Sequence, residues 1–175
     1  MFTPIKRIIL IIINLTLSIY SYLKGDFTYM FFLLIASGLL IYGYIKYGTV
    51  FIAFQQIKKG NIKKAEELIS KISNPYKLTK THKSYYYLAN GIIALEKQDL
   101  EKAKSDLIQS LNIGLRTEND KSIALLSLAN IELLKKNYNE ASEHIKKVRK
   151  LKLKQSIESA TNRIEKEING AQQYI

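Results

Sequence analysis

Two long stretches without a charged residue open the chain. Residues 8–23 form the first uncharged run, residues 27–45 form the second, and only three residues separate them. A helix needs about 20 apolar residues to cross a bilayer, within a range of roughly 17 to 25. The second run is long enough to cross a bilayer. The first run is slightly too short, but it can still cross if the basic side chains that flank it extend to the lipid headgroups. The pattern predicts a transmembrane hairpin within residues 1–46, with helices over about 8–23 and 27–45.

The charges around these runs predict the orientation of the hairpin. Lys6 and Arg7 precede the first run, Lys46 and further lysines follow the second, and the turn has no net charge. Segments that flank transmembrane helices on the cytoplasmic side are enriched in Lys and Arg. Both termini are therefore expected in the cytoplasm, and the turn is expected on the opposite side of the membrane. A cleaved signal peptide and a buried soluble core are the alternatives. No small-residue cleavage site follows the first run, which disfavours cleavage.

Residues 47–175 show a different pattern, in which apolar residues recur at helical spacing between short polar turns. No segment shows sustained alternation of apolar and polar residues, so strands are not expected and the fold class is all-α. We expect three helix pairs over about 49–73, 82–114 and 118–150. A further amphipathic helix over 154–169 is expected to cap the end of the array.

A short motif recurs through this second part at a fixed period. Each copy of the motif combines polar residues, one bulky apolar residue and a final alanine, and the copies are Gly60–Ala65, Gln98–Ala103 and Lys136–Ala141. The final alanines of successive copies are 38 residues apart. Self-similarity at such a period is typical of stacked helical repeats. Alanine suits a point where paired helices cross closely, and Ala53, Gly91 and Ala129 suit the same role on the first helix of each pair.

These pairs resemble tetratricopeptide repeats, whose usual length is 34 residues. The second pair matches that pattern with Tyr87, Gly91, Leu100, Ala103 and Leu107. The third matches it with Leu125, Ala129, Tyr138, Ala141 and Ile145, and the first with Ala53, Ile62, Ala65 and Ile69. This chain differs from the family pattern in two respects: its repeat period is longer, and the proline that usually closes each repeat is missing.

The resemblance implies a concave groove, lined by the first helix of each pair, that holds a peptide or an amphipathic helix. The implied positions are Val50, Phe51, Phe54, Ile57, Leu88, Ile92, Leu95, Leu126, Asn130 and Leu133. Almost all are apolar, and no lysine accompanies Asn130, so an acidic C-terminal tail is not the expected ligand. The groove could equally be covered by this chain's own capping helix, by its hairpin or by a second copy.

Composition adds a basic surface to this picture. The chain has 27 Lys and Arg against 15 Asp and Glu, a net charge of +12. The densest basic run contains Lys146, Lys147, Arg149, Lys150, Lys152 and Lys154. Such a run could contact an anionic leaflet or remain a solvated helix face. Aromatic residues do not interleave with it, which disfavours nucleic acid as its ligand.

The sequence offers little for catalysis or cofactors. It has no cysteine and two separated histidines, and it lacks a phosphate-binding glycine loop or a nucleophile with a paired base. We therefore expect no enzyme activity, no cofactor and no metal. The expected function is a membrane-anchored adaptor or scaffold that holds a protein partner at the inner leaflet. The alternative is a small structural subunit or assembly factor of a membrane complex, recognised through its transmembrane hairpin.

Overall fold

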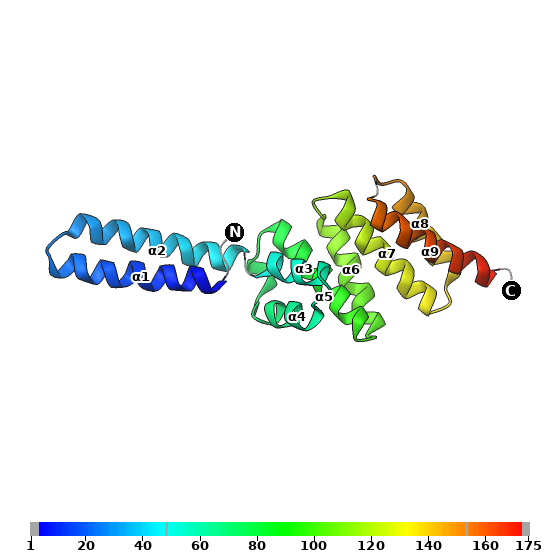
Figure 1. Ribbon diagram of the computed structural model, residues 1–175, viewed down its shortest axis with the longest axis horizontal. Helices are drawn as coiled ribbons and strands as arrows, with labels where there is room; N and C mark the ends of the chain where they lie inside the picture. The colour runs from blue at the N-terminus through cyan, green and yellow to red at the C-terminus, as the bar shows by residue number, and fades with distance from the viewer. Residues whose placement is uncertain (1–3, 48, 153, 173–175) are drawn as a thin grey trace.

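The computed structural model describes residues 4–47, 49–152 and 154–172, and in these ranges all regular structure is helical. The all-α fold class is therefore confirmed for this part of the chain. Figure 1 shows an elongated arrangement, with a two-helix hairpin at one end and the other helices following it in chain order.

The hairpin consists of α1 (Pro4–Leu23) and α2 (Phe27–Tyr47), which pack against each other along their length. Gly25 has a φ of 79° in the tight turn between them, in the left-handed region that favours glycine. Ser18 and Ser37 are buried between the two helices. Over the described residues, neither these nor any other helices have the length and apolar character needed to cross a membrane.

Three helix pairs follow the hairpin. Their first helices are α3 (Val50–Lys58), α5 (Lys80–Glu96) and α7 (Glu118–Leu134), and their second helices are α4 (Ile62–Ser70), α6 (Leu100–Ile113) and α8 (Tyr138–Arg149). A single turn of 3-10 helix, η1 (Pro75–Lys77), lies between the first two pairs. Each pair begins and ends within about three residues of the range that periodicity predicts.

The turn inside each pair has the same backbone geometry. Gly60, Gln98 and Lys136 have φ values of 79°, 62° and 62°, and they are spaced by the repeat length. The next residue in each turn donates its N–H to the carbonyl five residues before it, as in a Schellman motif. These bonds run from Asn61 to Gln56, from Asp99 to Ala94 and from Asn137 to Glu132. The recurring motif therefore marks a left-handed helix end, which holds the two helices of a pair antiparallel.

Small residues occupy the helix crossings, as the sequence predicts. Ala65, Ala103 and Ala141 are fully buried. A Cβ built on Gly91 would lie 2.7 Å from Leu107 Cγ and 3.1 Å from the Leu107 backbone nitrogen. Because Leu107 is itself fully buried, it has little room to move away.

We expect Gly91→Ala to lower the free energy of unfolding by about 1–3 kcal/mol, the usual cost of overpacking. The matched control is Gly170→Ala in α9 (Gln155–Gln172), because a Cβ there meets nothing within 4 Å. That change should raise stability by about 0.5–1 kcal/mol through helix propensity. Urea unfolding followed by circular dichroism measures both, and equal effects of the two changes would contradict the close crossing.

The last helix, α9, closes the far end of the array. It packs against α7 and α8, and Ile157, Ile164 and Ile168 are buried in a cluster with Ile145 and Val148. The helix therefore covers the apolar side of the third pair, as a cap is expected to do.

Candidate functional site

Four of the ten predicted groove positions are core residues. Val50 and Leu88 are fully buried, and Phe54 and Leu126 are only 2% and 8% exposed. The expectation that these side chains form an open partner-binding surface is therefore wrong. Buried side chains of this kind have no area left to offer a partner.

Consecutive first helices explain this burial, because α3 packs on α5 and α5 packs on α7. Phe54 meets the ring of Tyr85 edge-on, with ring centroids 5.1 Å apart. Leu126 belongs to the cluster that α9 completes with Ile157 and Ile164. Coverage by the chain's own capping helix, one of the alternatives that the sequence leaves open, therefore applies to Leu126. Val50, Phe54 and Leu88 are instead buried between neighbouring helix pairs, which the sequence did not indicate.

The other six positions keep some accessible surface. Phe51 is exposed, and its ring lies edge-on to Tyr85 at a centroid distance of 6.4 Å. The remaining five are half-buried on the first helices: Ile57, Ile92, Leu95, Asn130 and Leu133. Any partner surface on this side of the array is thus narrower than the sequence predicts.

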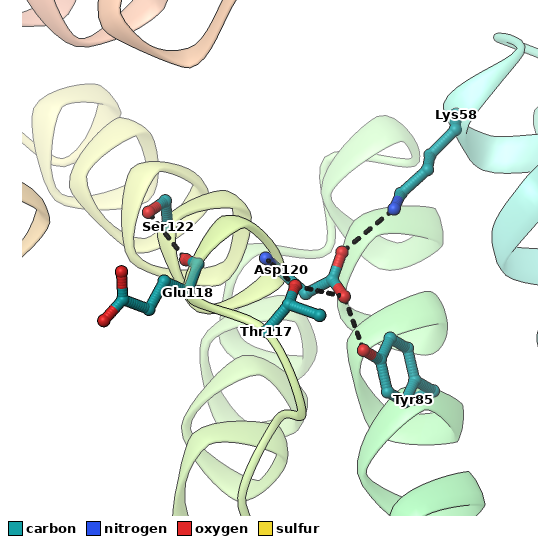
Figure 2. Close-up of polar contacts among 6 residues, drawn as sticks. All are labelled: Lys58, Tyr85, Thr117, Glu118, Asp120 and Ser122. Carbon is teal, nitrogen blue, oxygen red and sulfur yellow. Dashed lines mark hydrogen bonds and ion pairs between the residues drawn. The ribbon is translucent and has the colours of Figure 1, made fainter. Parts of the chain in front are cut away.

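Asp120 connects the first helices of all three pairs (Figure 2). Its Oδ1 lies 2.9 Å from Nζ of Lys58, at the end of α3. Its Oδ2 accepts hydrogen bonds from the hydroxyl of Tyr85 on α5 and, at 2.8 Å, from the hydroxyl of Thr117. Thr117 in turn caps α7 by accepting the Asp120 N–H at 3.1 Å. We call these four residues the Asp120 network.

The electrostatics of the Asp120 network favour a charged carboxylate. Burial alone would raise the pKa of Asp120, but the hydrogen bonds from Tyr85, Lys58 and Thr117 outweigh it and hold the pKa below its usual value. Burial and the bond to Asp120 raise the pKa of Tyr85. Each polar group thus has a partner inside the network. This arrangement suits a structural lock between repeats better than a site that must bind or transform a ligand.

Sequence reasoning did not identify the Asp120 network. The spacing Thr117-x-x-Asp120 matches a capping box and could have located the start of α7. Nothing in the spacing indicates Lys58 or Tyr85, which lie 62 and 35 residues away in the chain.

A cavity of about 300 Å³ lies between α4, α5 and the start of α6. An ion pair between Lys97 and Glu66 lies at this cavity, and Lys102 and Asp99 also line it. Its charged groups therefore have both signs. The cavity lacks the largely apolar lining that is typical of small-molecule sites.

The predicted basic run lies around the end of α8 and the turn into α9. Arg149 forms an ion pair with Glu165 of α9 at 2.6 Å, and Lys146 pairs with Glu143 at 3.0 Å. Figure 1 shows α8 and α9 at the opposite end of the array from the hairpin. The run therefore lies far from the hairpin along the array.

The largest apolar surface belongs to the hairpin. In the described part of the chain, all but four of the exposed large hydrophobic side chains lie on α1 or α2. Phe51, Tyr76, Ile108 and Leu134 are the four outside it. A large exposed apolar surface normally marks contact with a membrane or another protein.

Comparison of the chain with models of protein families, with curated proteins and with solved structures gives no match. Among the residues that the structure describes, no three His, Cys, Asp or Glu side chains gather where they could hold a metal ion.

Proposed function

We propose that this chain is a membrane-anchored adaptor, in which α1 and α2 are embedded in the cell membrane and the helix pairs hold a protein partner on the cytoplasmic side. The exposed apolar surface of the hairpin carries the proposal. Ile12 and Ile35 are 55% and 45% exposed, although α1 and α2 already bury their shared face. Water is a poor environment for so many outward-facing isoleucine, leucine and phenylalanine side chains. The basic residues that flank both runs support an orientation with the array on the cytoplasmic side.

The helix pairs supply the partner-binding part of this proposal. Pairs that recur with one turn geometry form an extended surface of the kind that helical repeats use for binding. The Asp120 network supports a fixed relation between α3, α5 and α7, so the exposed Phe51 and the half-buried Ile92 and Leu133 would meet a partner with little reorganisation. An amphipathic helix or a peptide with apolar anchors fits such a surface best. The anchor would raise the local concentration of this partner at the membrane.

A second candidate is a small subunit or assembly factor of a membrane complex, recognised through the hairpin itself. The burial of Val50, Phe54, Leu88 and Leu126 favours it, because the array keeps little apolar surface for a partner. The hairpin keeps most of that surface and would then contact other membrane helices.

A capture experiment separates the two candidates. The full chain and a fragment of residues 47–175 are each used to capture crosslinked proteins from native membranes. If the fragment, checked for helical content, still captures the partner of the full chain, the adaptor proposal holds. Loss of that partner with the hairpin favours the second candidate, and absence of any partner from both would contradict both.

A further inference from the structure

The point where the hairpin joins the array is fixed by a buried threonine. Thr49 is 1% exposed, and its hydroxyl donates to the carbonyl of Leu68 near the end of α4. Two residues of extended chain span at most about 7 Å, so the end of α2 at Tyr47 must lie close to Thr49. The segment that follows α4 therefore starts beside the end of the hairpin that joins the array. This holds at any angle between the hairpin and the array.

That segment is anchored beside α3, because its Leu78 is buried in one cluster with Val50 and Phe54. Residues 71–83, which we call the basic loop, contain η1 and the first turn of α5. Asn74 caps η1 by accepting the Tyr76 N–H at 2.9 Å. Immediately after the loop, the ring of Tyr85 contacts Phe51 and Phe54 on α3. Both ends of the basic loop are thus held near the first turns of α3, where the hairpin enters.

The charge of the basic loop is entirely positive. It contains Lys71, Lys77, Lys80 and Lys83, and residues 68–95 include no Asp or Glu. None of these lysines takes part in an ion pair within the described ranges of the chain. Two residues of the predicted basic run, in contrast, have carboxylate partners.

An exposed aromatic ring accompanies these charges. Tyr76 is 72% exposed, and Nζ of Lys83 lies over its ring, 4.7 Å from the centroid. Tyrosine is enriched at membrane interfaces, where its ring meets the headgroups and its hydroxyl stays in water. A loop whose lysines have no carboxylate partner among the described residues, and which carries such a ring, matches the chemistry of anionic phospholipid headgroups.

We infer that the basic loop rests on anionic phospholipids of the same membrane that holds the hairpin. This inference depends on the proposed membrane anchoring. Electrostatic attraction to a charged leaflet extends over about a Debye length, roughly 8–10 Å at physiological salt. The tether through Thr49 keeps the loop near this range. The loop contact then sets the angle of the array to the membrane and leaves α8 and α9 free on the far side.

Tryptophan fluorescence tests the inference, because the chain contains no tryptophan. Single variants Tyr76→Trp and Leu134→Trp place a reporter on the basic loop and on an exposed site at the end of α7. The full-length variants are reconstituted in phosphatidylcholine vesicles with or without phosphatidylglycerol, with a spin label on a fraction of the headgroups. We expect stronger quenching of Tyr76→Trp than of Leu134→Trp when phosphatidylglycerol is present. Replacing the four loop lysines by glutamine should reduce the quenching of Tyr76→Trp to the level seen for Leu134→Trp.

Phe31→Trp in α2 is the control for membrane anchoring, and lipids brominated in the acyl chain should quench it. If they do, two outcomes overturn the inference about the basic loop without affecting the anchoring proposal. The first is equal quenching of Tyr76→Trp and Leu134→Trp in anionic vesicles. The second is a response of Tyr76→Trp to a DNA duplex but not to phosphatidylglycerol. If Phe31→Trp is not quenched, the anchoring proposal fails and the inference fails with it.

Discussion

Aspartate at both Ile12 and Ile35 is expected to release the full chain from membranes. A single aspartate at the centre of a membrane helix costs about 2.5–3.5 kcal/mol, so the two together should lower membrane partitioning roughly ten-thousand-fold. Both side chains project away from the contact between α1 and α2, since each is about half exposed. The substitutions therefore leave the hairpin packing intact, and a change in partitioning reports on its surroundings. The measurement is the fraction of protein in the pellet after alkaline extraction of membranes.

Leu134→Asp is the matched control for this experiment. Leu134 is 59% exposed at the end of α7, so its replacement adds a charge to the array and not to the hairpin. The control should stay in the pellet like the unmodified chain. If the Ile12→Asp, Ile35→Asp variant also stays there, the hairpin is not surrounded by lipid.

Asp120→Ala is expected to cost about 2–4 kcal/mol of stability, because it leaves the buried Tyr85 hydroxyl without its acceptor and removes the Thr117 bond. Half of the Lys58 side chain is exposed, so the ion pair contributes the smaller part. Urea unfolding of the full chain in mild detergent measures the change. Asp106→Ala is the control: burial raises the pKa of Asp106, so the fold does not stabilise that charge and its removal should cost little.

A double-mutant cycle with Tyr85→Phe tests whether the cost arises from the Asp120 network. If it does, Asp120→Ala should cost clearly less in the Tyr85→Phe background than in the unmodified chain. Additive effects would contradict a direct contribution from this hydrogen bond.

The same network predicts a pH dependence with a definite sign. Because the folded-state pKa of Asp120 lies below its usual value, its stabilising contribution is complete above that usual value, about 4, and is lost as pH falls through the folded-state pKa. The stability difference between the unmodified chain and Asp120→Asn should therefore shrink below about pH 4. A difference that stays constant down to pH 2 would contradict a stabilised charge at Asp120.

The helices could be predicted because their signals are local. The spacing of apolar residues and the position of Gly60 indicate where helices begin and end, and both are read from residues close together in the chain. The alanine motif likewise indicates crossings between helices that are adjacent in the chain. Gln98 and Lys136 adopt the same left-handed turn without being glycine, and only their register with Gly60 reveals it.

Contacts between pairs could not be predicted in the same way. Phe54 and Leu88 lie on the helix face assigned to a partner, but that face turns toward the neighbouring pair. The angle between consecutive pairs decides whether such a face is core or groove, and this angle depends on packing across many residues. The bonds of Lys58 and Tyr85 to Asp120 depend on the same angle and left no signal in the spacing.

Thiol accessibility tests most directly whether the hairpin lies in a membrane. The chain has no cysteine, so Ile35→Cys and Leu134→Cys each provide a single thiol at a site that is exposed in the structure. Both full-length variants are treated in native membranes with a membrane-impermeant maleimide, before and after detergent is added. We predict rapid labelling of Leu134→Cys once the reagent has access to the cytoplasmic face, and protection of Ile35→Cys until detergent dissolves the membrane. Equally rapid labelling of the two thiols before detergent would contradict the membrane anchor.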